Sequence, residues 1–327
     1  MFRALVLDQQ DGKTQAQVRT LQESQLPEGE VLVAVDYSSL NFKDGLAITG
    51  SGKIVSQFPM VPGVDLAGRV LESADDAFSP GDAVVLTGWG VGERHWGGMA
   101  EKARLKADWL VPMPQDMDAR TAMMIGTAGL TAMLCVMALE EGGLTPAAGP
   151  VLVTGAAGGV GSVSVVILAA LGYEVHAVTG RPETEAYLKG LGAHALVSRE
   201  SMASKPRALE AQRWAGAIDT VGDTILARVL AETHYGGTVA ACGLAAGFSL
   251  PTTVMPFILR NVRLQGVDSV MCPLSRRQQA WQRLARELPA AALGEIGHSI
   301  GLDEVPDYAQ RIVEGQVRGR VIVDMSR

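Results

Sequence analysis

The chain has 327 residues, of which 47% are hydrophobic and 19% charged, so disorder is excluded and two domains are expected rather than one small core. A net charge of −7 and an aromatic content of 5% argue against a groove for nucleic acid. The three cysteines (Cys135, Cys242 and Cys272) are too far apart for a disulfide framework or a zinc site, which favours a reducing cytoplasm. Residues 1–8 lack the apolar core of a secretory signal.

The first third of the chain is predicted to form short strands separated by turns. The expected strands are residues 2–7, 30–36, 65–71 and 83–86, with turn signals at 26–29 and 79–82. Strands at this spacing indicate a barrel-like β domain.

Two stretches, 121–139 and 142–173, lack charged residues over a length that could span a membrane. Pro146, Pro150 and a glycine cluster would break a spanning helix in the second stretch, and the first has no aromatic belt. We therefore expect both to lie buried inside a soluble protein.

From residue 149 the pattern becomes an alternation of strands and helices. We expect strands at 151–154, 174–179, 195–197, 216–219, 238–242 and 263–266, with helices at 162–171, 183–191 and 224–233. This order predicts an α/β fold with a doubly wound parallel sheet. A helix at 275–287 and a hairpin-like pair around residues 318–320 follow, and the tail is expected to rejoin the first domain.

The glycine-rich segment after the first of these strands has the spacing of a dinucleotide fingerprint, with Ala156, Gly158 and Gly161 at its key positions. Gly158 and Gly159 let the backbone approach a pyrophosphate, whose negative charge is favoured by the start of the helix. The alternative is a tight strand–helix turn that binds no ligand.

The end of the second strand decides between NAD and NADP. An acid there would bind the ribose hydroxyl of NAD, but the chain has Thr179, Gly180 and Arg181, with no acid before Glu183. A hydroxyl and a guanidinium favour the extra phosphate of NADPH by roughly 1.5–3 kcal/mol. Arg199 is either a second cation for this phosphate or a solvated loop arginine.

Several longer motifs carry a family resemblance. Segments 38–44 (SSLNFKD), 59–68 (PMVPGVDLAG), 86–92 (LTGWGVG), 95–98 (HWGG) and 251–260 (PTTVMPFILR) resemble zinc-independent medium-chain dehydrogenases/reductases of the quinone oxidoreductase type, and within them the acryloyl-CoA reductase (NADPH) subfamily. The resemblance implies a GroES-like β-barrel domain at 1–122, completed by 271–327, and a Rossmann domain at 123–270. It also implies a homodimer with NADPH in the cleft between domains.

The same resemblance implies a set of NADPH contacts, the last three of which line the nicotinamide side. They are Phe42, Ala157, Gly158, Gly159, Val160, Thr179, Gly180, Arg181, Arg199, Leu244, Ile258 and Ser269.

No metal is expected at the site. Zinc-dependent relatives carry Gly-His-Glu where this chain has Gly63, Val64 and Asp65, so an aliphatic side chain replaces a catalytic ligand. The five histidines show no metal-binding spacing either.

A site without a Lewis acid suits hydride transfer to the β-carbon of an α,β-unsaturated thioester, with an enolate developing at the carbonyl oxygen. Asn41 is the first candidate to donate a hydrogen bond to that oxygen, and its alternative role is an Asx turn. Related sequences often have tyrosine at the position of Phe42. Unlike tyrosine, phenylalanine has no hydroxyl and cannot donate a proton. Solvent, Asp44 or Asp65 is therefore the candidate proton source, unless Asp44 is a helix cap and Asp65 a packed structural acid.

The phosphates of CoA need cations, and Arg260, Arg263, Arg276 and Arg277 are candidates between which the sequence does not decide. The leading hypothesis is an NADPH-dependent reductase of acryloyl-CoA or a similar short enoyl-CoA. The alternatives are an NADPH:quinone or general enone oxidoreductase and a catalytically silent NADPH-binding sensor.

Overall fold

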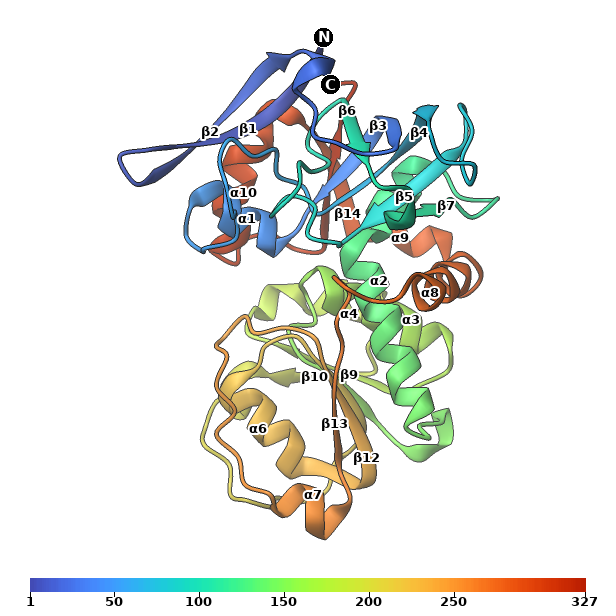
Figure 1. Cartoon of the computed structure of the whole chain (residues 1–327). Coiled ribbons are helices and arrows are strands. Elements are labelled where there is room, and N and C mark those ends of the chain that lie inside the picture. Colours follow the sequence, from blue (N-terminus) through green and yellow to red (C-terminus); the bar gives the residue numbers. More distant parts are fainter. The chain divides into compact units, whose positions relative to one another are not determined.

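The computed structural model describes the backbone of residues 1–327 and every side chain except that of Ala290. The chain folds into two compact units (Figure 1). Unit 1 comprises Met1–Thr127, Ser269–Ala285 and Leu293–Arg327, and unit 2 comprises Ala128–Asp268 and Arg286–Ala292. The sequence placed these boundaries after residues 122 and 270 and assigned the whole tail to the first domain. The segment Arg286–Ala292 instead belongs to unit 2, because the chain leaves unit 1 near the end of one C-terminal helix and returns within the next.

Unit 1 is built around a seven-stranded sheet in the order β14-β15-β3-β4-β5-β7, with β6 pairing to β3. A separate antiparallel pair, β1 and β2, begins the chain. The strands are β1 (Phe2–Gln10), β2 (Lys13–Leu21), β3 (Val31–Leu40), β4 (Asp65–Ser73), β5 (Ala83–Thr87), β6 (Lys102–Leu105), β7 (Leu110–Pro112), β14 (Gly297–Gly301) and β15 (Arg320–Asp324). Their buried aliphatic side chains, among them Val33, Leu66 and Val323, form one core.

The expected hairpin around residues 318–320 is wrong. Only β15 forms there, and it pairs parallel with β14 and antiparallel with β3. Helix α10 (Val305–Val313) separates β14 from β15, so the connection is long enough for a parallel pair. The tail does rejoin the first unit, as expected.

Three further helices lie wholly or mainly in unit 1, namely α1 (Phe42–Thr49), α8 (Leu274–Glu287) and α9 (Ala290–Ile296). Helices α1 and α10 lie side by side (Figure 1), and Gly45 permits this approach because a Cβ there would lie 2.6 Å from Ile312 Cγ2. Short 3-10 helices occupy Glu23–Gln25, Ala107–Trp109, Pro146–Ala148, Pro182–Thr184 and Leu302–Glu304.

Helix α2 (Ala119–Glu141) carries the chain from unit 1 into unit 2. It is long and apolar enough to cross a membrane, but 94% of its most apolar 18-residue window is buried inside the protein. The first uncharged stretch is therefore a buried helix, as predicted. Gly126, with φ 53° and ψ −157°, breaks α2 into two segments.

Unit 2 contains a six-stranded parallel sheet in the order β10-β9-β8-β11-β12-β13. Counted from β8, this order is that of a doubly wound dinucleotide-binding fold, and it confirms the predicted parallel sheet. The strands are β8 (Val151–Val153), β9 (Val175–Thr179), β10 (Ala195–Ser198), β11 (Trp214–Asp219), β12 (Thr233–Ala241) and β13 (Arg263–Gly266). The helices are α3 (Gly159–Ala170), α4 (Glu185–Gly190), α5 (Arg199–Met202), α6 (Asp223–Glu232) and α7 (Met255–Arg260).

From β8 the next two strands of the chain, β9 and β10, are added on one side, and β11 to β13 are added on the other. The carboxyl ends of the parallel neighbours β8 and β11 therefore mark the switch point at which such sheets bind ligands. The second uncharged stretch, residues 142–173, supplies β8, the glycine-rich turn and α3 to this edge.

Candidate functional site

The glycine-rich turn leads directly from β8 into α3, which begins at Gly159 with Gly158 as its N-cap, three residues before the expected start. Gly161 is required by close packing, because a Cβ there would lie 2.3 Å from Gly155 O. The first turn of a helix leaves N–H groups without intrahelical acceptors, so this end of α3 favours an anion. Residues Ala157–Val160 lie at this end of α3, and their contact with a pyrophosphate stays a prediction.

Thr179, the last residue of β9, and the two residues that follow it lie against this turn. Arg181 N donates a hydrogen bond to Thr179 Oγ1 (3.1 Å), which folds the chain back at Gly180. Arg181 Nη2 then reaches Ala157 O at 3.4 Å. The predicted phosphate-binding residues of β9 and the glycine turn are therefore neighbours.

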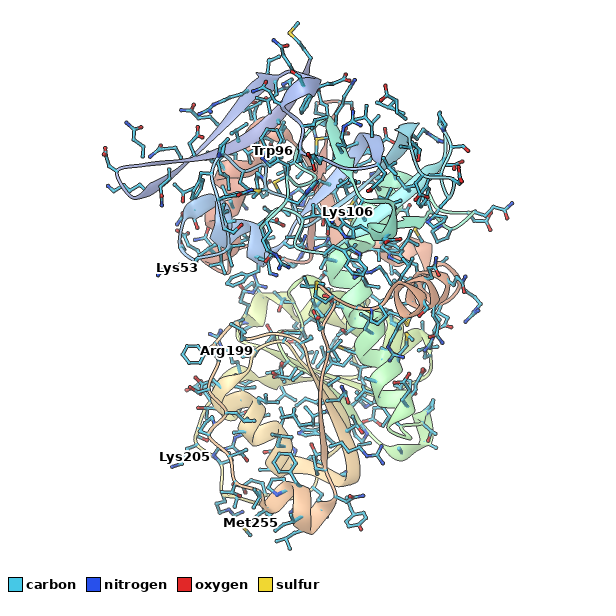
Figure 2. All side chains as sticks on the ribbon, viewed as in Figure 1. Lys53, Trp96, Lys106, Arg199, Lys205 and Met255 are labelled. Atoms are coloured by element: carbon cyan, nitrogen blue, oxygen red, sulfur yellow. The ribbon has the colours of Figure 1, made fainter. Side chains whose placement is uncertain are left out.

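Arg199, labelled in Figure 2, begins α5 and lies directly over Gly180. A Cβ at Gly180 would be 2.5 Å from Arg199 Nε and 2.6 Å from its Cζ, so the guanidinium occupies the space that a side chain would fill. Both residues line an open cavity of about 850 Å³, together with Thr179, Ser198 and Thr224. Thr179, Gly180 and Arg199 thus meet at one cavity, which the acids Glu185, Glu200 and Asp223 also line, and Arg181 directly follows Gly180 in the chain. Phosphate binding by this group stays a prediction.

The remaining predicted cofactor contacts are divided between the two units. Leu244 and Ile258 are 64% and 71% exposed on unit 2. Phe42, at the start of α1, is 43% exposed, and Ser269 is buried, both in unit 1. The nicotinamide side of the site stays a prediction for these four residues.

Asp219, at the end of β11, was not predicted as a site residue, and its carboxylate links the segments that follow β8 and β11. Its Oδ1 accepts from Thr154 Oγ1 (2.7 Å) at the end of β8, and its Oδ2 accepts from Gly222 N (2.8 Å). Burial raises the pKa of Asp219. An acid that ends an otherwise apolar strand was the available signal.

The three predicted catalytic residues form one cluster in unit 1. Asn41 is half-buried and is the N-cap of α1, while Asp44 and Asp65 are buried. Asn41 Nδ2 donates to Asp65 Oδ2 (3.0 Å), and Asn41 N donates to Asp44 Oδ2 (2.9 Å). The three residues predicted from the sequence therefore lie together, and their catalytic roles stay a prediction.

The hydrogen bonds of Asp44 match its alternative role as a helix cap. Its Oδ1 accepts from Gly63 N (3.1 Å) and Val64 N (3.0 Å), so it links α1 to the loop before β4. Burial, reinforced by the neighbouring Asp65 carboxylate, raises the pKa of Asp44 to about 7.

Asp65 is likewise held by several donors. Ser39 N (2.9 Å) and Ser39 Oγ (2.7 Å) donate to its Oδ1, and Thr127 N (2.9 Å) donates to its Oδ2. It is therefore a packed acid within unit 1, which matches the structural alternative raised for it.

Arg320, at the start of β15, is a member of the cluster that sequence reasoning missed. It is buried, and it donates to Asn41 Oδ1 (3.2 Å), Ser39 Oγ (2.6 Å) and Met124 O (3.1 Å). An arginine that opens an apolar strand was the only local signal, because its partners are far away in sequence.

Two of the four arginines considered for CoA phosphates are already committed to backbone carbonyls. Arg277 is buried, donates to Thr87 O (2.7 Å) and Ser269 O (3.2 Å), and lies 4.9 Å from the ring of Trp89. Arg260 donates to Ala231 O (2.7 Å) and Glu210 O (2.6 Å). Arg263 is exposed and Arg276 half-buried. The buried guanidinium of Arg277 serves packing, so that candidate role is wrong.

Among the side chains described, no group of three or more His, Cys, Asp or Glu residues could hold a metal ion. Val64, where zinc-dependent relatives carry histidine, is 5% exposed and packs into unit 1.

Two family models match the chain. "Alcohol dehydrogenase GroES-like domain" matches residues 27–115 and "Zinc-binding dehydrogenase" matches residues 159–288. These matches, together with the parallel sheet, confirm the predicted GroES-like and Rossmann-type domains.

Three full-length relatives are closely similar. The chain is 61% identical to the probable acrylyl-CoA reductase AcuI of Escherichia coli, over 99% of this chain and 100% of that protein. It is 56% identical to the acrylyl-CoA reductase AcuI of Ruegeria pomeroyi, over 100% of both. The crystal structure of the YhdH oxidoreductase of Salmonella enterica in complex with NADP has a TM-score of 0.98 and 60% identity, covering 98% of this chain and 99% of that one.

Proposed function

Since the chain belongs to the acrylyl-CoA reductase AcuI family of medium-chain dehydrogenases/reductases, we propose that it reduces the carbon–carbon double bond of acryloyl-CoA, or of a similar short enoyl-CoA, with NADPH. The observation that carries this proposal is the full-length identity to two proteins named acrylyl-CoA reductase.

The residues of unit 2 fit NADPH. Ala157–Val160 bind the pyrophosphate through backbone N–H groups, and Thr179, Arg181 and Arg199 bind the 2′-phosphate. The space left by the missing side chain at Gly180, which the Arg199 guanidinium fills, supports this assignment. When bound, NADPH supplies the hydride that is added to the β-carbon of the thioester.

The reaction also needs a proton at the α-carbon. Asp44 and Asp65 are buried and hydrogen-bonded within unit 1, and Phe42 has no proton to give. We propose that solvent supplies this proton and that the two acids hold the backbone around Asn41 in place through their hydrogen bonds.

The defining experiment is a panel of acceptors assayed with purified enzyme by the loss of NADPH absorbance. Acryloyl-CoA is expected to be turned over far more efficiently than quinones or simple enones, NADH to support little activity, and a chelator to have no effect. Quinone reduction at least as efficient as thioester reduction would establish the alternative oxidoreductase. NADPH binding without turnover of any acceptor would establish the sensor.

The cofactor assignment has its own test. Arg181→Ala is expected to raise the NADPH dissociation constant about ten- to a hundredfold while leaving that of NADH nearly unchanged. Arg263→Ala is the matched control, because Arg263 begins β13, at the opposite edge of the same sheet from β9 and β10. An unchanged NADPH dissociation constant in Arg181→Ala would remove the 2′-phosphate assignment.

We further propose that the enzyme is a cytoplasmic homodimer that works without zinc, with unit 1 as the catalytic domain and unit 2 as the NADPH-binding domain. Three free cysteines and an aliphatic Val64 at the zinc-ligand position support the compartment and the metal independence. Light scattering of the purified protein measures the subunit number, and metal analysis of the active enzyme tests for zinc.

A further inference from the structure

The side-chain amide of Asn41 lies between two groups of opposite charge. Its Oδ1 accepts from Arg320 Nη1 (3.2 Å), and its Nδ2 donates to Asp65 Oδ2 (3.0 Å). A guanidinium only donates hydrogen bonds and a carboxylate only accepts them. A flipped amide would turn its N–H groups toward the cation and its oxygen toward the anion, so one orientation is fixed.

Ser39 accounts for the rest of the amide's donors. The backbone oxygen of Ser39 (3.3 Å) and its Oγ (3.2 Å) are the further acceptors for Asn41 Nδ2. The same Oγ donates to Asp65 and accepts from Arg320 Nη2. Both Nδ2 hydrogens therefore have acceptors inside unit 1, and what remains for a ligand is the second lone pair of Oδ1.

The charged pair is anchored independently of Asn41, at the break in α2. Arg320 donates to Met123 O (3.3 Å) and Met124 O (3.1 Å), the carbonyls that end the first helical segment. Asp65 accepts from Thr127 N (2.9 Å), which starts the second segment. A cation at the end of one helix and an anion at the start of the next both match the helix dipoles. The pair is thus held by contacts that do not involve Asn41.

We propose that Asp65 and Arg320 are positioning residues that lock Asn41 so that it meets a ligand as a hydrogen-bond acceptor through Oδ1. Its ligand is an N–H or O–H donor, carried either by NADPH or by the acyl-CoA. This role rests on the proposed function and reverses the donor role expected from the sequence, because an enolate oxygen has no proton to offer Oδ1.

The amide can be observed directly, because Asn41 and Asn261 are the only two asparagines of the chain. After selective labelling with ¹⁵N-asparagine, nuclear magnetic resonance should show two side-chain amide groups, and Asn41→Ala assigns them. Asn261 is exposed, so it serves as the internal control. The Asn41 amide hydrogens are expected to exchange slowly with solvent, those of Asn261 rapidly.

Adding ligands then shows whether Asn41 accepts a hydrogen bond from a ligand or donates one to it. NADPH alone, propionyl-CoA alone and both together are added to the labelled protein, since the saturated thioester cannot be reduced. Asn41 is expected to keep its slow exchange in all three, with a chemical-shift change only in the arm whose ligand contacts Oδ1. Loss of the protection on binding either ligand would overturn the proposal, because the amide would then have left Asp65 or Ser39 to donate to that ligand.

A double-mutant cycle tests the positioning role. Arg320→Lys keeps the charge but loses the planar fork that reaches Asn41, Ser39 and the helix carbonyls together. It is expected to lower kcat/KM for the enoyl-CoA about ten- to a hundredfold in the wild-type background, but less than about threefold in the Asn41→Ala background. Equal losses in both backgrounds would show a merely structural role and overturn the proposal.

The cycle needs folded variants, which thermal unfolding monitors. Should Arg320→Lys fail to fold, the exchange measurement on the wild-type protein still decides whether the amide is locked. Absence of acryloyl-CoA reduction by the wild-type enzyme would refute the proposed function alone, since amide protection is read without turnover.

Discussion

Replacing Gly126 by alanine should destabilise unit 1 strongly. Its φ of 53° and ψ of −157° belong to a region open to glycine, and a side chain there costs about 1–3 kcal/mol of strain. The new Cβ would lie 2.4 Å from Arg320 Nη2 and 2.8 Å from Ser39 Oγ. The buried guanidinium must then shift and lose at least one charge-assisted hydrogen bond, worth about 1.5–3 kcal/mol.

Together these terms lower the free energy of unfolding by roughly 2.5–6 kcal/mol, a large share of the stability of a typical domain. Urea unfolding followed by tryptophan fluorescence measures the loss. Gly143→Ala is the control, since Gly143 also has a positive φ (92°) but a Cβ there would meet nothing within 4 Å. Its loss should be limited to about 1–2 kcal/mol of strain. Equal losses in the two variants would refute the idea that Gly126 makes room for the charged cluster.

Three other substitutions probe the site. The pKa of Asp44 is raised to about 7 in the folded protein. Between about pH 4 and pH 7 the folded state therefore keeps a proton that the unfolded state has released. The free energy of unfolding should fall by up to roughly 4 kcal/mol over this range. Asp44→Asn should remove this fall in urea titrations across that range, and an unchanged slope would contradict the assignment. Gly180→Ala should push the Arg199 guanidinium away and raise the NADPH dissociation constant about tenfold, measured by calorimetry, with little effect on that of NADH. Gly190→Ala, whose Cβ would meet nothing within 4 Å, should change neither constant. An equal rise for both nucleotides would count against the phosphate site. Arg277→Met should leave the buried carbonyls of Thr87 and Ser269 without this donor, at about 1–3 kcal/mol each, and so lower the free energy of unfolding by about 2–6 kcal/mol. An unchanged midpoint of thermal unfolding would contradict its packing role.

The fold of unit 2 was largely predictable because its signals are local. A short apolar strand, a glycine turn and an apolar helix each occupy a continuous stretch, and the alternation of strands and helices predicts a parallel sheet. Thr179 and Arg181 could be chosen for the same reason, since they directly follow a predicted strand.

The cluster in unit 1 was only half predictable. Asn41, Asp44 and Asp65 lie in motifs that identify the family, but Arg320 reaches Asn41 and Ser39 across 279 and 281 residues of sequence. No local periodicity encodes such a contact, nor the break in α2 at Gly126, which depends on the charges around it. The parallel pairing of β14 with β15 was missed for another reason. The helix between them, α10, had not been predicted, and without it the connection looked like a hairpin.

The position of β15 has a consequence for biosynthesis. This strand, Arg320–Asp324, lies between β14 and β3 in the sheet, although it follows every strand of unit 2 in the chain. All six strands of unit 2 lie between residues 151 and 266, so we expect that sheet to form while the chain is still emerging from the ribosome. Strand β3 is made before unit 2, but it can pair with β15 only after all six strands of unit 2 have been made. The amide of Asn41 gains its guanidinium neighbour, Arg320, at that same late stage.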